Sequence, residues 1–174
     1  MLGGPLTDAA DARERARRVL PRLVFDYIDG AAGQEAGEAY NRATLRATQL
    51  QPRILRDVRD RRLATTILGQ DMNLRFGIAP MGMCNLAWPG ADLLLARLAA
   101  REGVPHGLST VASTSMEQVW DAAQGRAWFQ LYYSGDGAGT IKLVERAKAV
   151  GYQTLVLTVD VPEVGRRPRE LKQG

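Results

Sequence analysis

The sequence predicts an α/β fold in which four apolar strands alternate with helices. The expected strands are FGIAP (76–80), PHGLS (105–109), AWFQLYY (127–133) and TLVLTVD (154–160), with a helical pattern between each strand and the next. Strands joined through single helices form parallel βα units. Such units build either a (β/α)₈ barrel or a doubly wound sheet, and the pattern alone leaves both open.

The segment before these units predicts three helices. Thr7 or Asp8 can cap a helix that runs to about Leu20, and Pro21 opens a second helix that Gly30 ends. A third helix is expected over about 34–48. The string LATTILGQDMNLRF then contains two short β-prone runs around Gly69-Gln70-Asp71, which predicts a hairpin that would form a lid or a floor.

The helices between the strands show amphipathic stripes. In the first, one face is expected to carry Leu94, Leu95, Leu98 and Ala99. Thr114 and Glu117 have capping-box spacing at the start of the second. The stripe of the third is expected to be Ile141, Val144 and Ala147.

Composition and charge describe an ordinary globular protein. Of the 174 residues, 45% are hydrophobic and 24% charged, and the net charge is only +4. Basic residues do not cluster with aromatic ones, so we expect no nucleic-acid partner. The N-terminus lacks a signal-peptide core, and no window reaches transmembrane length. The single cysteine, Cys84, is expected to be a small buried residue, in keeping with a cytoplasmic location.

Polar residues gather where the predicted strands end, in APMGM, STVASTS, QLYYSGDG and TVDVPEVGRR. In both candidate folds the carboxyl ends of the strands line the active site. Gln130 inside an apolar strand and Asp160 at the end of another also need polar partners if they are buried. We therefore expect this edge of the sheet to be the functional one.

One interpretation of this edge is nicotinamide binding. SGDGAGT (134–140) follows a strand, opens a helix and supplies Gly135, Gly137 and Gly139, and Asp160 follows about 20 residues later. However, the dinucleotide pattern requires a third glycine where Thr140 stands, and it belongs in a first βαβ unit. A simple glycine turn explains the string as well.

A second interpretation comes from eight strings taken together. They are LPRLVFDYIDGAA, NRATL, LQPRILRDV, TTILGQDM, GIAPMGM, LSTVASTSMEQV, WFQLYY and LVLTVDVPEVGRRPREL. In order and spacing, from about Leu20 to Lys172, they resemble the N-terminal half of the FMN-dependent α-hydroxy acid dehydrogenases and oxidases, which include glycolate oxidase, L-lactate dehydrogenase and mandelate dehydrogenase. The resemblance implies a (β/α)₈ TIM barrel, with FMN as cofactor and a small 2-hydroxy acid as substrate.

The resemblance also divides the chain. It implies a helical segment with a hairpin over residues 1–75 and the first half of the FMN-binding barrel, roughly four βα units, over 76–174. A complete barrel needs about 250 residues. We therefore expect a C-terminal half, from the same gene or a companion chain, without which this chain is inactive. The resemblance also implies that the protein forms a homo-oligomer, namely a homotetramer.

The resemblance implies two sets of site residues. Ala79, Pro80, Met81 and Gly82 would run along the flavin with the Gly82 N–H facing N5, and Ser109, Gln130 and Thr158 would hydrogen-bond the isoalloxazine. Tyr27 would contact the substrate carboxylate, Tyr132 the α-hydroxyl or product carbonyl, and Arg167 the anionic substrate. Asp160 would hydrogen-bond a catalytic histidine of the C-terminal half. No metal is expected.

Three further positions qualify this picture. His106 begins a strand at the end away from the site, so we expect it to be structural. Met81 stands where relatives often carry threonine, which removes one side-chain contact to the flavin. Val111 stands where glycolate oxidase has a large aromatic residue and mandelate dehydrogenase a small one, which favours a bulky or aromatic 2-hydroxy acid. The alternatives to this enzyme are the nicotinamide domain and a non-catalytic half-barrel that serves as a binding module.

Overall fold

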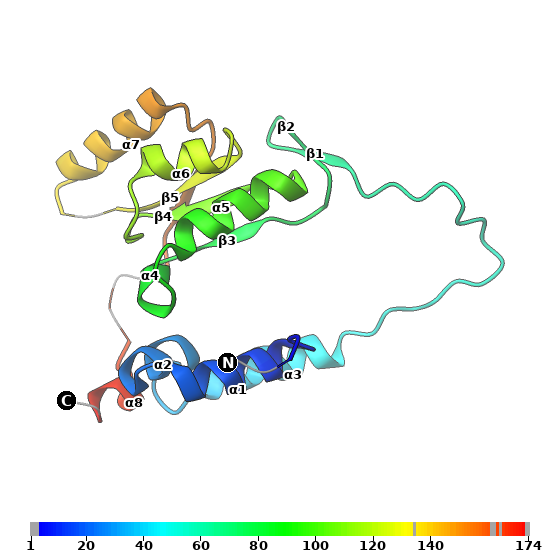
Figure 1. The fold of residues 1–174 in the computed structure, drawn as a ribbon, viewed down its shortest axis with the longest axis horizontal. Coiled ribbons are helices and arrows are strands. Elements are labelled where there is room, and N and C mark those ends of the chain that lie inside the picture. The colour runs from blue at the N-terminus through cyan, green and yellow to red at the C-terminus, as the bar shows by residue number, and fades with distance from the viewer. Residues whose placement is uncertain (1–3, 134, 161–162, 164, 173–174) are drawn as a thin grey trace. The chain divides into compact units, whose positions relative to one another are not determined.

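The computed structural model describes residues 4–133, 135–160, 163 and 165–172, and it divides the chain into two compact units (Figure 1). The first unit comprises Met1–Arg56 with Glu163–Gly174, and the second Asp57–Pro162. This division differs from the predicted boundary after residue 75. The hairpin belongs with the sheet because its contacts are there, and the segment from Glu163 packs on the N-terminal helices.

The first unit contains the three predicted helices and a short fourth one. They are α1 (Ala9–Val19), α2 (Arg22–Asp29), α3 (Ala36–Ala47) and α8 (Pro168–Leu171). Asp8 caps α1, because its carboxylate accepts a 2.8 Å hydrogen bond from the Asp11 N–H. Gly30 is the C-terminal cap of α2, as expected. The starts and ends of all three helices lie within two residues of the prediction.

The second unit is built on a four-stranded parallel sheet. Its strands are β3 (Ile78–Met81), β4 (His106–Ser109), β5 (Ala127–Tyr132) and β6 (Leu155–Thr158), in the order β3-β4-β5-β6. The helices that follow β3, β4 and β5 are α4 (Cys84–Ala87) with α5 (Ala91–Glu102), α6 (Met116–Ala122) and α7 (Ala138–Val150). β3, β4 and β5 therefore each open a βα unit, and the prediction of parallel strands joined through helices is confirmed.

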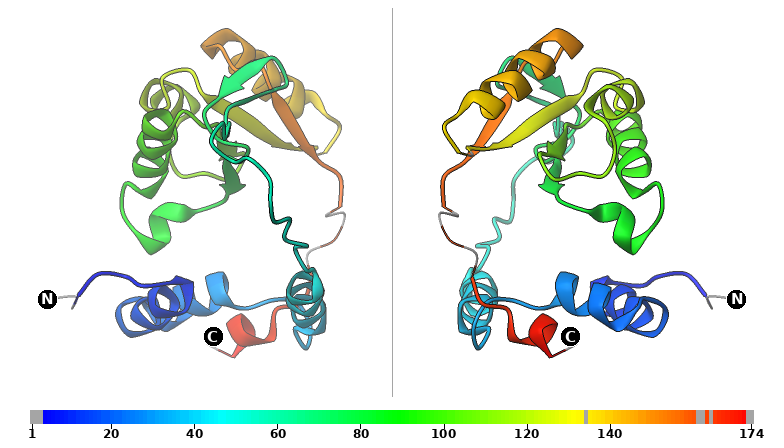
Figure 2. Two further views of the ribbon diagram at one scale, coloured as in Figure 1. Left: turned by 90° about the vertical axis from the view of Figure 1, so that its right-hand side faces the viewer. Right: turned by 90° about the vertical axis from the view of Figure 1, so that its left-hand side faces the viewer.

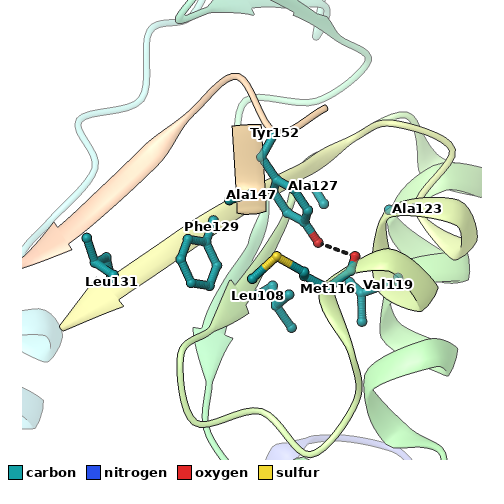
Figure 3. Close-up of a cluster of buried hydrophobic side chains, with 10 residues drawn as sticks. Leu108, Met116, Val119, Ala123, Ala127, Phe129, Leu131, Ala147 and Tyr152 are labelled. Carbon is teal, nitrogen blue, oxygen red and sulfur yellow. Dashed lines mark hydrogen bonds between the residues drawn. The ribbon is translucent and has the colours of Figure 1, made fainter. Parts of the chain in front are cut away.

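The core lies between one face of this sheet and the helices α5, α6 and α7 (Figures 1 and 2). Phe129, Leu108 and Leu131 point from the strands into this layer, as Figure 3 shows. Tyr152 closes one end, where its hydroxyl donates a 2.8 Å hydrogen bond to the Met116 carbonyl. The burial of these side chains supplies most of the driving force for the fold of the unit.

The faces that α5 and α7 present to the core match the predicted stripes except at Leu94 and Ile141. α5 buries Ala96 and Ala99, whereas Leu94 is exposed, and α7 buries Ala147, whereas Ile141 is exposed. Leu93, Leu143 and Val144 also pack against the core, so the inner faces of these helices combine alanines with larger apolar residues. The predicted stripes were therefore correct only for Ala99, Ala147 and the partly buried Leu95, Leu98 and Val144.

The capping box of α6 begins one residue later than predicted. Ser115 is the N-cap, and its hydroxyl accepts from the Gln118 N–H at 3.3 Å. The Thr114 hydroxyl instead accepts from the Asn85 side chain at 3.1 Å. The prediction of Thr114 as the N-cap was wrong by one residue, because Thr114 and Ser115 are adjacent and both residue types can cap a helix.

The hairpin pairs β1 (Thr65–Ile67) with β2 (Gln70–Met72) through a turn at Leu68-Gly69, one residue earlier than predicted. Both turn residues have positive φ, 51° and 78°, as a two-residue hairpin loop requires. The hairpin is fixed at the start of β5, since the Trp128 indole donates to the Gln70 side chain at 2.9 Å. It is thus a floor at the amino ends of the strands.

Candidate active site

Three of the predicted flavin-contact residues form one hydrogen-bonded row across the carboxyl ends of β4, β5 and β6. The Ser109 hydroxyl donates to Gln130 Oε1 at 3.2 Å, and Gln130 Nε2 donates to the Thr158 hydroxyl at 2.7 Å. Ser109 and Gln130 are only 6% and 3% exposed. Gln130 in an apolar strand therefore has the partners that its burial demands.

The backbone next to Ser109 fixes which way the Gln130 amide points. The N–H of Thr110 can only donate, and it lies 3.2 Å from Gln130 Oε1. The oxygen must therefore face β4 and the nitrogen must face β6. Thr158, which accepts from that nitrogen, keeps its hydroxyl hydrogen for another acceptor. The row is uncharged and retains donors for a ligand.

A β-bulge shapes the strand beside this row. Ile78 pairs with His106 and Met81 with Leu108, so two residues of β3 stand opposite Gly107 alone. A Cβ at Gly107 would lie 2.7 Å from the Pro80 nitrogen, which explains the glycine. Pro80 is tolerated because β3 is at the edge of the sheet. Ala79, Pro80 and Met81 are all exposed, as residues that line a ligand would be.

Gly82, which follows β3, lies under the side chain of Val111. A Cβ at Gly82 would come within 2.5 Å of Val111 Cγ2. The two segments are also joined by the backbone, because the Met83 N–H donates to the Val111 carbonyl at 3.1 Å. Val111 thus controls the space beside the predicted flavin-facing N–H, and its own side chain is 47% exposed.

Tyr132 belongs to the same side of the sheet as the row, and Asp160 lies just beyond the end of β6. Side chains alternate along a strand, so Tyr132 shares a face with Gln130, and it is paired in register with Thr158. Asp160 follows Thr158 by two residues. It is exposed and makes no hydrogen bond or ion pair within the described part of the chain. A group that approaches this face would therefore find the Asp160 carboxylate available.

The other two predicted substrate residues, Tyr27 and Arg167, meet in the first unit. The Arg167 guanidinium carbon lies 5.0 Å from the centre of the Tyr27 ring, a cation–π geometry. Its Nη2 donates to the carbonyls of Tyr27 and, at 3.1 Å, of Gly30, and its Nε is paired with Glu170. Among described contacts Nη1 has none, so it is the nitrogen that remains for an anion.

A network of ion pairs around the largely buried Asp29 carboxylate holds Arg169, and with it α8, against the end of α2. The Asp29 carboxylate accepts from Arg169 at 2.7 Å and also pairs with Arg13, and Arg169 reaches Glu35 at 2.5 Å. These hydrogen bonds, first that of Arg13 and then that of Arg169, outweigh burial and hold the pKa of Asp29 below its ordinary value. Tyr27 and Arg167 are thus held together by neighbours as well as by their own contact.

His106 and Cys84 do not belong to this chemistry. His106 starts β4, three residues before Ser109, and is 3% exposed; burial lowers the pKa of its imidazole. Burial raises the pKa of the Cys84 thiol, and its side chain is half-buried rather than buried as predicted. No group of three potential metal ligands of the Cys, His, Asp or Glu type occurs in the described ranges. Those ranges also contain no helix that is both long and apolar enough to span a membrane.

The comparisons with known proteins decide between the interpretations of this edge. Residues 16–174 match the model of the FMN-dependent dehydrogenase family. The chain belongs to this family. The nicotinamide alternative loses its basis, since the family's cofactor is FMN.

Individual members of the family agree over nearly the whole chain. It is 39% identical to a 4-hydroxymandelate oxidase of Amycolatopsis orientalis over 165 residues, and this matched region covers 95% of this chain and 46% of that protein. It is 38% identical to an L-lactate dehydrogenase of Xanthobacter autotrophicus, over 97% of this chain and 44% of the relative. A crystal structure of mandelate oxidase with (S)-4-hydroxymandelic acid superimposes with a TM-score of 0.90, at 39% identity, over 95% of this chain and 46% of that one.

The comparisons also settle the fold class. The similarity confirms that the parallel sheet and its helices are part of a (β/α)₈ barrel rather than a doubly wound sheet. The chain spans a little under half the length of the curated relatives that it matches.

The neutral donor row fits the cofactor of the family. The isoalloxazine ring is uncharged in its oxidised form, has polar edges, and is held by short neutral donors and acceptors. Ser109, Gln130 and Thr158 supply such groups near the exposed residues Ala79, Pro80 and Met81. Thr110 adds a contact to the row itself, since its N–H donates to Gln130 Oε1. The sequence carries no signal for this role, because a threonine after a strand is common and has no distinctive pattern.

Proposed function

We propose that the protein takes part in the FMN-dependent oxidation of an L-2-hydroxy acid to the 2-oxo acid. The observation that carries this proposal is the uncharged row Ser109–Gln130–Thr158 at the carboxyl ends of three parallel strands in a member of this family. Bound FMN would supply the acceptor for the two electrons that leave the substrate. The residues of this chain bind and orient.

The flavin would lie along Ala79, Pro80, Met81 and Gly82, with the row at its polar edge. Gln130 Nε2 retains one hydrogen beyond the one given to Thr158, and Thr158 retains its hydroxyl hydrogen. Both can donate to ring carbonyl or nitrogen atoms. Because these donors are held by other protein groups before any ligand binds, little ordering is needed on binding.

Substrate binding would use Tyr132, Tyr27 and Arg167, the residues that the resemblance to the family assigns to it. The Tyr132 hydroxyl would hydrogen-bond the α-hydroxyl of the substrate and later the product carbonyl. Tyr27 would contact the carboxylate, and Arg167 would face it through Nη1, the nitrogen not engaged with carbonyls or Glu170. A guanidinium beside a tyrosine hydroxyl is well suited to an anionic ligand.

The proton acceptor would come from a C-terminal half. Asp160 is exposed and has no partner among the residues that the structure describes, so its carboxylate can accept from a histidine and stabilise the protonated form. β6 is also an edge strand whose Leu155 and Leu157 side chains are 46% and 52% exposed. A further strand and helix would cover this apolar edge and bring the histidine to Asp160.

The substrate would be bulky or aromatic. Val111, beside Gly82, is small for a position that in glycolate oxidase holds a large aromatic residue, and this leaves room for a ring. The similarity to a 4-hydroxymandelate oxidase and to a mandelate oxidase solved with (S)-4-hydroxymandelic acid supports this choice. We expect a higher kcat/KM for (S)-mandelate than for glycolate, and the reverse order would refute it.

An absorption spectrum of the purified protein tests the proposal most directly. Bands at about 375 and 450 nm, as flavins show, are expected, and in the protein completed by its C-terminal half the long-wavelength band should bleach when (S)-mandelate is added without oxygen. A colourless protein that binds NADH would favour a nicotinamide domain, and one that binds neither cofactor a non-catalytic half-barrel.

The partner is tested separately. Intact-mass analysis should reveal either a longer chain or a companion of similar size, whereas a monodisperse, folded 19.0 kDa monomer without a companion would refute the need for a C-terminal half. The cytoplasmic location and the homotetrameric state stay predictions, to be checked by fractionation and analytical ultracentrifugation.

A further inference from the structure

Thr110 connects two strands at the point where the regular sheet stops. β4 ends at Ser109, while the neighbouring β5 continues to Tyr132. In a parallel ladder, a residue at position 110 would give its backbone N–H to the Gln130 carbonyl and offer its own carbonyl to the Tyr132 N–H. Without a substitute, both groups of β5 would lose their partners.

The Thr110 side chain takes over both of these ladder bonds. Its hydroxyl donates to the Gln130 carbonyl at 2.5 Å and accepts from the Tyr132 N–H at 3.3 Å. A hydroxyl can do this because it is both donor and acceptor. Its backbone N–H is then free to bond Gln130 Oε1 at 3.2 Å, the contact that orients the amide.

This exchange lets β4 leave the sheet without loosening β5. The chain turns immediately after Ser109, with the Ala112 N–H bonded to the Ser109 carbonyl at 3.0 Å, and so carries Val111 over Gly82. At the same time the backbone on either side of Leu131 stays fixed. Two residues assigned to the flavin and the substrate, Gln130 and Tyr132, are therefore held by the same hydroxyl.

We propose that Thr110 is a positioning residue that sets the amide orientation of Gln130 and the backbone position of Tyr132. The catalytic part of this inference rests on the proposed function, whereas its structural part does not. Thr110 is assigned no contact with substrate or flavin, so it acts only through these two neighbours.

The test compares Thr110→Val, which keeps the shape but removes the hydroxyl, with Thr110→Ser, which keeps the hydroxyl. In the full-length protein, hydrogen exchange at the Tyr132 amide should be about tenfold faster in Thr110→Val, because one hydrogen bond is lost, and unchanged in Thr110→Ser. Thr114→Val, on the same loop but bonded to Asn85, is the matched control and should leave this amide unchanged.

Binding and kinetics give the second readout. In Thr110→Val, FMN should dissociate more readily, by about tenfold when measured from flavin fluorescence, and kcat should fall with KM nearly unchanged; Thr110→Ser should restore both. Equal exchange at Tyr132 in Thr110→Val and the parent would overturn the proposal. Should Thr110→Val not fold, an unprotected Tyr132 amide in the parent would overturn it. Failure of the proposed function would instead appear as absence of FMN with the exchange result intact.

Discussion

Replacing Gly82 with alanine should destabilise the second unit and disturb the flavin site, and the damage should depend on Val111. The new Cβ would lie 2.5 Å from Val111 Cγ2, whereas two carbon atoms prefer about 3.5–4.0 Å. Valine has little freedom at χ1, and its backbone is tied to Met83 by a 3.1 Å hydrogen bond. The valine cannot retreat by a simple rotation.

The magnitude follows from this geometry. Overpacking a closed core costs about 1–3 kcal/mol, and since Val111 is 47% exposed, the lower part of that range, about 1–2 kcal/mol, is expected for Gly82→Ala. Val111→Ala removes the opposing methyl group. The double variant should therefore recover about 1 kcal/mol relative to the sum of the two single changes.

Urea denaturation followed by tryptophan fluorescence measures these values, and flavin fluorescence measures FMN affinity on the same samples. Gly139→Ala is the matched control, because a Cβ there meets nothing within 4 Å and the residue lies in α7. That change should be neutral or stabilising by up to about 1 kcal/mol. Strict additivity of Gly82→Ala and Val111→Ala, or a Gly82→Ala protein as stable as the parent, would refute the steric reasoning.

Three further predictions concern the supporting structure. Because burial depresses the pKa of His106, the contribution of this histidine to stability is complete above pH about 6.5 and declines as the pH falls through the pKa of the folded state. His106→Gln should flatten the dependence of stability on pH. An NMR titration midpoint of His106 at or above 6.5 would contradict this prediction. The pKa of Asp29 is also depressed, so the packing of Arg169 on it should persist above pH about 3.8 and weaken below it, with faster hydrogen exchange in α8, whereas Asp29→Asn should show fast exchange at every pH. Tyr152→Phe removes the hydrogen bond to the Met116 carbonyl and should lower the free energy of unfolding by about 1 kcal/mol in urea titrations; an unchanged midpoint would show that this bond contributes nothing.

The order of the elements, the parallel βα units and the family could all be predicted from the sequence. Alternating apolar runs and helical patterns are local properties, so the strands and the helices α1, α2 and α3 could be placed to within about two residues. Eight motifs in the order and spacing of the family predicted it, because each is a short string that can be read from one sequence, and the family model confirms the prediction. The candidate site residues were also found in this way, since they lie within those strings.

Tertiary structure alone decided which faces are buried and which side chains support the site. Leu94 and Ile141 were predicted to be core residues, yet both are exposed, whereas Ala96, Ala99 and Ala147 of the same helices are buried. The role of Thr110 depends on where β4 stops relative to β5, and the need for glycine at position 82 depends on Val111, which lies on a different segment. These are distances between residues far apart in the chain, and no local pattern encodes them.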